Sequence, residues 1–140
     1  MRVVLDADVL IGALDNSDPH HTRARRLFVG WERRDDARLI SVVNLTEVLV
    51  APAADRSRLR TAREAIAALG VAIHQPGEAI GVEAARLRNT YPISLPDAYC
   101  LATARHADAQ VASFDEKVLH TADRERLTTI ETRARQPRRR

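Results

Sequence analysis

The sequence contains one cysteine, one lysine and no long apolar run. The single cysteine, Cys100, allows no disulfide bond within the chain and no metal site built from several cysteines. No stretch approaches the roughly 18 consecutive apolar residues of a membrane-spanning helix. The apolar run at the N-terminus is also interrupted by acidic residues too early to be a signal peptide. We therefore expect a soluble protein without a membrane partner that works in the reducing cytoplasm.

Positive charge is concentrated at the C-terminus. The formal net charge is +3, but residues 133–140 hold five arginines and no acid. Without these arginines, residues 1–132 carry a net charge of −2. The global charge therefore says little about the partners of the folded part. We expect a single domain over residues 1–132, with 45% hydrophobic residues in the whole chain, followed by a basic, disordered tail over residues 133–140.

Short apolar runs alternate with helical patterns along the domain. We expect strands at residues 2–5, 38–42, 71–73, 110–112 and 127–130. Helices are predicted from residue 6 to Gly12, over 20–34, from Asn44 as N-cap, over 55–69 with Gly70 after its end, over 76–90, and from Ser94 onward. Strands that alternate with helices form parallel sheets covered on both faces. The predicted fold class is therefore α/β, a three-layer α/β/α domain with a central, mainly parallel sheet.

Acidic residues stand where predicted strands end or helices begin. They are Asp6 and Asp8 after the first strand, Glu47 on the helix after the second, Asp97 in a first helical turn, and Asp115 after the fourth strand. Each acid alone also has a structural explanation, because such residues commonly cap helices or lie exposed on them. Ligands of parallel sheets bind beyond the carboxyl ends of the strands, however, which is where these acids would meet.

Several carboxylates in one cleft repel one another unless a cation neutralises them. Oxygen ligands without cysteine suit hard ions such as Mg²⁺ or Mn²⁺. Such ions bind phosphates and activate water for phosphodiester hydrolysis. The residues themselves therefore predict a carboxylate metal site on an α/β fold.

The acids lie in four segments: Val3-Val-Leu-Asp-Ala-Asp-Val-Leu-Ile11, Ser41-Val-Val-Asn-Leu-Thr-Glu-Val-Leu49, Leu95-Pro-Asp-Ala-Tyr-Cys-Leu-Ala-Thr-Ala104 and Ser113-Phe-Asp115. These segments resemble the motifs of the PIN-domain ribonucleases, and among them those of the VapC-type toxins of bacterial toxin–antitoxin pairs. Their order and spacing cover nearly the whole chain. The resemblance implies an α/β/α domain that cleaves RNA internally with Mg²⁺ or Mn²⁺ as cofactor.

The resemblance also implies roles for individual residues. The metal would be held by Asp6, Glu47, Asp97 and Asp115, and Glu47 would also help to orient the attacking water. Ser113 stands where the family has a hydroxyl residue that supports the site by hydrogen bonding. Asp8 departs from the small hydroxyl or amide residue common at its position. It can add a metal ligand, accept a hydrogen bond near the ligands, or cap the helix.

Partners follow from the same resemblance. Such toxins form homodimers and are inhibited by a small antitoxin, whose tail lies over the active-site groove and whose other end binds operator DNA. Helices 20–34 and 55–69 offer apolar and basic residues for dimer or antitoxin contacts, although core packing explains the same apolar residues. Four arginines of the first of these helices either follow an RNA backbone or form a solvated helix face: Arg23, Arg26, Arg33 and Arg34.

Other functions stay open at this point. The chain can be a PIN nuclease of RNA processing without a toxin role, or a catalytically silent PIN-like binding module. A haloacid-dehalogenase-like phosphatase also carries an Asp-x-Asp motif like that of Asp6 and Asp8, but it needs a later lysine and a further acidic pair, and the only lysine here is Lys117. Cysteine–histidine catalysis would need an exposed Cys100, whose place near an apolar stripe favours burial instead.

Overall fold

The computed structural model describes residues 1–130, which fold around a four-stranded sheet. The strands are β1 (Arg2–Leu5), β2 (Ala37–Ser41), β3 (Val71–His74) and β4 (Gln110–Ala112), in the spatial order β3-β2-β1-β4. All neighbouring strands are parallel, and Val4 of β1 pairs with Leu39 on one side and with Val111 on the other. The predicted parallel sheet is confirmed, with β1 in its interior.

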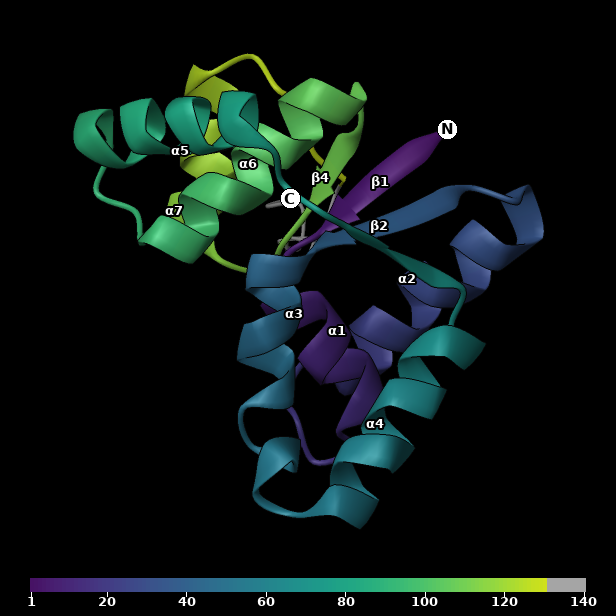
Figure 1. Ribbon diagram of the computed structural model, residues 1–140. Coiled ribbons are helices and arrows are strands. Elements are labelled where there is room, and N and C mark those ends of the chain that lie inside the picture. The colour runs from purple at the N-terminus through teal and green to yellow at the C-terminus, as the bar shows by residue number, and fades with distance from the viewer. Residues whose placement is uncertain (131–140) are drawn as a thin grey trace.

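Helices cover both faces of this sheet. They are α1 (Ala7–Leu14), α2 (His21–Arg34), α3 (Val42–Leu49), α4 (Arg56–Ala68), α5 (Glu78–Thr90), α6 (Leu95–Ala107) and α7 (Glu116–Arg124), with a 3-10 turn η1 (Pro52–Ala54). Figure 1 shows α1 to α4 on one side of the strands and α5 to α7 on the other. The predicted three-layer α/β/α domain is confirmed.

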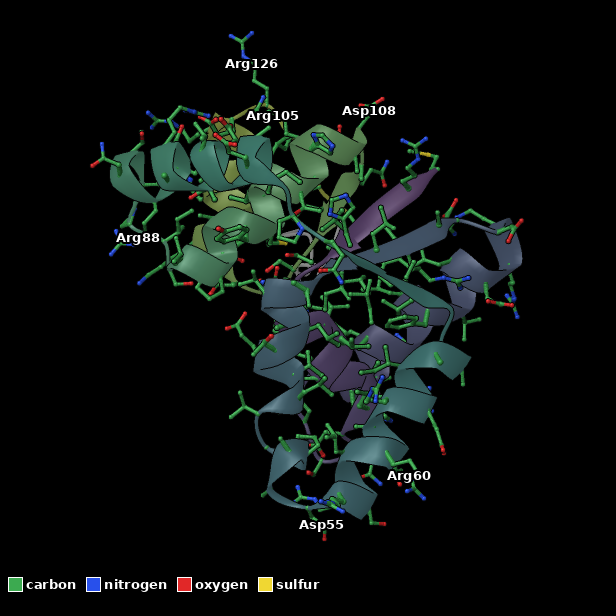
Figure 2. The ribbon with its side chains drawn as sticks, in the orientation of Figure 1. Asp55, Arg60, Arg88, Arg105, Asp108 and Arg126 are labelled. Carbon is green, nitrogen blue, oxygen red and sulfur yellow. The ribbon has the colours of Figure 1, made fainter. Side chains whose placement is uncertain are left out.

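Each face of the sheet has its own hydrophobic core because alternate side chains of a strand point to opposite faces. Val3 and Leu5 pack with the helices α1 to α4, whereas Val4 packs with α5 to α7. Charged side chains stand at the rim of the molecule in Figure 2, where Asp55 and Arg60 mark the α4 end. None of the helices between residues 1 and 130 combines the length and the apolar character that crossing a bilayer requires.

Three predicted helix starts and ends are wrong. Gly12 does not end α1, because it lies inside the helix where α2 comes close: a methyl group there would lie 3.3 Å from the Cβ atom of Ala24. Asn44 does not cap α3. The helix begins earlier, with Ser41 as the cap. The Ser41 Oγ accepts a hydrogen bond from the Val43 N–H at 3.3 Å. The helix predicted over 76–90 begins at residue 78.

The C-terminal part differs most from the prediction. The strand expected at 127–130 is wrong, because Thr129 forms only an isolated parallel bridge with Val111. Helix α7 was not predicted, although apolar residues recur at helical spacing from Val118 to Ala122. The predicted domain end at residue 132 and the basic tail over 133–140 lie outside the described residues.

Candidate active site

Three aspartates stand at the beginnings of helices near the carboxyl edge of the sheet. Asp6 follows β1 and caps α1 by accepting a hydrogen bond from the Ala7 N–H at 2.8 Å. Asp97, the third residue of α6, closes a capping box with Ser94. Asp115 follows β4 and caps α7. In Figure 1 the ends of β1 and β4 lie near the beginnings of α1 and α3, and a short loop leads from β4 to α7. The same residues therefore cap helices and converge on one place, and the positive helix ends favour their negative charge.

The loop of residues 113–115 holds two of the acids. The Ser113 hydroxyl donates a hydrogen bond to Asp6 Oδ2 at 2.7 Å and accepts one from the Asp115 N–H at 3.0 Å. The Phe114 N–H donates to Asp8 Oδ2 at 3.0 Å. The second carboxylate oxygen of Asp8 is buried without a hydrogen-bond partner among residues 1–130. Asp6, not Asp8, is therefore the cap of α1, and Asp8 is tied to the loop after β4.

Glu47 is fixed by a residue whose role the sequence interpretation missed. Asn44 is fully buried, and its side-chain N–H group donates to Glu47 Oε1 at 3.3 Å and to the Pro96 carbonyl at 3.1 Å. Because Pro96 directly precedes Asp97, Asn44 connects the helix of Glu47 to the helix of Asp97. The three-residue spacing from Asn44 to Glu47 places both on one helix face, but only once the helix is known to begin at residue 42.

The carboxylates influence one another electrostatically. Burial, together with the negative charges of Asp8 and Asp97, raises the pKa of Asp6 to about 8, although the hydrogen bond from Ser113 acts to lower it. Burial also raises the pKa of Asp8 to about 6, with contributions from the charges of Asp115 and Asp97. The pKa of Glu47 is raised by burial and by the charge of Asp97. Asp97 therefore acts on three of the other four acids.

The five acids Asp6, Asp8, Glu47, Asp97 and Asp115 are called the acid group below. Cys100 lies near the acid group without taking part in its chemistry. The side chain is completely buried. Burial, and then the negative charges of nearby acids including Asp6 and Asp97, raises the pKa of the thiol well above its usual range. A thiol that stays protonated is not a nucleophile. The interpretation of Cys100 as a packing residue fits this environment, and cysteine–histidine catalysis does not.

A profile of the PIN domain matches residues 3–124, a range that includes all five acids. The chain belongs to the PIN domain family. The resemblance seen in the sequence motifs is thereby confirmed. Membership of the PIN domain family also decides against the haloacid-dehalogenase-like phosphatase.

Several solved structures share the PIN fold of this chain. VapBC-1 from nontypeable Haemophilus influenzae has a TM-score of 0.72 and 15% sequence identity, covering 94% of this chain and 98% of that chain. VapC20 from Mycobacterium tuberculosis, a toxin that cleaves the sarcin–ricin loop, has a TM-score of 0.69 and 17% identity, with 84% and 93% covered. FitAcB from Neisseria gonorrhoeae has a TM-score of 0.67 and 18% identity, with 93% and 97% covered. At these identities the likeness establishes a shared fold. No curated protein sequence matches the chain.

The donor atoms of this PIN domain fit a divalent cation by their chemistry. Carboxylate oxygens are the ligands that Mg²⁺ and Mn²⁺ prefer. The buried, unpartnered Asp8 Oδ1 lacks the neighbour that a cation or water would supply. The main influences on the pKa values of Asp6 and Asp8 are burial, hydrogen bonds and other carboxylates, so a positive charge placed here would relieve repulsion. No three Asp, Glu, His or Cys side chains of residues 1–130 are already gathered in a metal-binding arrangement.

Proposed function

We propose that this PIN-domain protein is a metal-dependent endoribonuclease and the toxin of a type II toxin–antitoxin pair. The observation that carries the proposal is the group of five carboxylates that act on one another at the carboxyl edge of the sheet. Family membership and the fold shared with VapC and FitAcB structures support the same activity. RNA as the substrate is supported by VapC20, which is described as cleaving the sarcin–ricin loop.

Four acids would hold the metal: Asp6, Glu47, Asp97 and Asp115. When bound, Mg²⁺ or Mn²⁺ stabilises negative charge on the phosphate and makes a bound water more acidic. Asp8 would accept a hydrogen bond at the site or join the ligands through its unpartnered oxygen. Ser113 keeps Asp6 in place through their 2.7 Å hydrogen bond.

Glu47 would orient the attacking water and accept its proton. Its side chain is exposed, unlike the buried carboxylate of Asp6. Its raised pKa makes the ionised form a better proton acceptor, and Asn44 limits the positions of Oε1. Hydrolysis replaces one bond between phosphorus and a bridging oxygen by a bond to the water oxygen, which divides the RNA chain.

An antitoxin is the expected protein partner, and operator DNA would be contacted only through it. Support comes from the VapBC-1 structure, from a Klebsiella pneumoniae toxin–antitoxin complex and from FitAB bound to a DNA fragment. A groove of about 580 Å³ between α1, α3 and α4 includes Glu47 in its lining, together with apolar residues such as Ile11, Leu14 and Val48. A peptide lying in this groove would cover part of the acid group. We also propose a homodimer that works in the cytoplasm.

Cleavage of RNA by the purified protein tests the proposed activity. The substrates are total cellular RNA and a hairpin with the sarcin–ricin loop sequence, each incubated with Mg²⁺, with Mn²⁺ or with a chelator. We expect internal cleavage with either ion, none with the chelator, and loss of cleavage in Asp97→Asn. Asp108→Asn is the matched control, because Asp108 is exposed at the end of α6 and points away from the molecule in Figure 2.

Three outcomes would contradict the proposal in different ways. Intact RNA under all conditions would favour a silent binding module. Full activity of Asp97→Asn under limiting metal would contradict the site. The absence of a small DNA-binding protein from the neighbouring reading frames would favour a nuclease of RNA processing over a toxin.

A further inference from the structure

An aromatic and basic cluster lies directly beside the acid group. We call it the Phe114 cluster; it consists of His20, Arg23 and Phe114. The rings of His20 and Phe114 are stacked, with centroids 4.5 Å apart and planes inclined by 18°. The Arg23 guanidinium lies over the Phe114 ring, with Cζ 4.9 Å from the centroid. Arg23 also donates a hydrogen bond to His20 Nδ1 at 2.6 Å, because a guanidinium can only donate.

The backbone connects the Phe114 cluster to the acids. Phe114 stands between Ser113 and Asp115, and its own N–H binds Asp8. The ring that supports the Arg23 guanidinium therefore belongs to the loop that holds two carboxylates. This arrangement places a half-buried guanidinium against the ring of Phe114, in the loop whose backbone N–H binds Asp8.

The other arginines of α2 have different surroundings. Arg25, Arg26 and Arg33 line a shallow surface region on α2, away from the loop of residues 113–115. Arg34 pairs with Asp36 at 2.9 Å near the end of the helix. Of the four arginines considered for RNA binding from the sequence, Arg23 is the one that contacts the loop of the acid group.

RNA is a polyanion, so its phosphates are repelled by the five carboxylates. A bound metal would relieve this repulsion only close to the metal. A guanidinium suits a phosphate in a neighbouring position because its planar set of donors matches two phosphate oxygens. Contacts with an aromatic ring and with His20 reduce the number of conformations that Arg23 would lose on binding. The cluster therefore has the charge and the restricted geometry of a phosphate-binding position.

We propose that Arg23, held by His20 and Phe114, binds a phosphate of the RNA strand adjacent to the phosphate that is cleaved. The inference rests on the proposed nuclease function, whose site it extends. Arg23 acts on substrate position, while the acids and their metal carry the chemistry. The contact would favour RNA strands whose backbone passes along the start of α2.

Salt-dependent binding of a fluorescein-labelled oligouridylate tests this role by fluorescence anisotropy. All proteins carry Asp97→Asn, so that the RNA stays intact, and Mg²⁺ is constant while KCl varies. We expect Arg23→Gln to weaken binding about tenfold, as for loss of one charge-assisted hydrogen bond. The slope of log affinity against log salt should also become shallower by about 0.7, the value for one contact on a single strand.

Two further variants separate a phosphate contact from a structural effect. Arg23→Lys keeps the charge and should retain the slope, whereas Arg25→Gln removes one charge from the exposed side of the same helix and should leave both affinity and slope near the parent values. An unchanged slope in Arg23→Gln, or an equal change in Arg25→Gln, would overturn the inference.

RNA cleavage by the wild-type protein, which lacks Asp97→Asn, is measured in parallel. If RNA is cleaved but the slope of the binding assay does not respond to Arg23→Gln, only this inference fails. If RNA is never cleaved, the proposed function fails.

Discussion

Replacing Asp6 by a side chain that cannot ionise should stabilise the metal-free protein at neutral pH. The native state keeps a proton on Asp6 up to about pH 8, whereas an unfolded chain releases it near 3.8. The native state therefore binds more protons between these values, and the free energy of unfolding falls as the pH rises through this window. One such group contributes a slope of about 1.4 kcal/mol per pH unit. Between pH 5 and pH 7 the loss is about 3 kcal/mol, or about 10 °C in Tm for a domain of this size.

Asp6→Asn keeps the shape of the side chain and removes this titration. In the presence of a chelator, the difference in Tm between Asp6→Asn and the wild type should therefore grow in favour of the variant from pH 5 to pH 7. Part of the pH dependence remains in the variant, because burial also raises the pKa of Asp8 to about 6. Mn²⁺ should raise the Tm of the wild type strongly at pH 7 and that of Asp6→Asn much less, because the cation binds the ionised carboxylates.

Thermal unfolding followed by circular dichroism measures both effects, with Asp108→Asn as the matched control. The control should track the wild type at every pH and metal concentration. A difference between Asp6→Asn and wild type that is constant from pH 5 to pH 7 would refute the electrostatic reasoning. An equal response of the two proteins to Mn²⁺ would refute the link between Asp6 and the metal.

Three other substitutions test individual residues. Ser113→Ala removes the hydroxyl that donates to Asp6 and accepts from the Asp115 N–H. We therefore expect a free energy of unfolding in urea that is about 2 kcal/mol lower, together with a lower kcat. Ser113→Thr keeps the hydroxyl and should retain the stability and the kcat of the wild type. Asn44→Ala should cost about 2 kcal/mol and reduce kcat more than it changes KM, because Glu47 loses its donor; unchanged kcat would contradict the role of Glu47. Gly70→Ala should cost about 1 kcal/mol or more, because the φ angle is +71° and the new Cβ would lie 2.9 Å from Arg38 Nη2; RNA cleavage should not change.

The main features of the fold follow from local patterns in the chain. The apolar run of β1 and the capping box of α6 are both visible in the sequence and present in the structure. Asp55 was expected to begin α4, and it caps that helix. These features are predictable because strand burial and helix capping depend on residues that are close in sequence.

The remaining differences depend on contacts between distant residues. Gly12 resembles a helix end, but its small size serves the close approach of α1 to Ala24 on α2. Asn44 resembles a cap, but the fold buries it between Glu47 and Pro96, which is 52 positions later in the chain. Neither distant partner can be identified from the local pattern.

The acid group also has some features that local sequence predicts and others that depend on distant contacts. The residues that carry carboxylates could be named from their places after strands and at helix starts. The loop contacts could not, because the donor to Asp8 is the main-chain N–H of Phe114, which every residue except proline possesses. The stacking of Phe114 with His20 likewise joins residues far apart in the sequence. Side-chain types therefore predicted the candidate chemistry, and tertiary structure supplied the groups that hold it in place.

Calorimetric titration of the metal-free protein with Mn²⁺ is the most direct test of the central proposal that these carboxylates form one metal site. The titration is carried out near pH 8 on the wild type, on Asp97→Asn and on Asp108→Asn. Asp97 is the informative position because its charge acts on Asp6, Asp8 and Glu47. We predict saturable binding by the wild type and by Asp108→Asn, and binding at least about tenfold weaker by a folded Asp97→Asn, equivalent to the loss of about 1.4 kcal/mol or more. Equal Mn²⁺ affinity in all three proteins, or no binding by the wild type, would contradict the account.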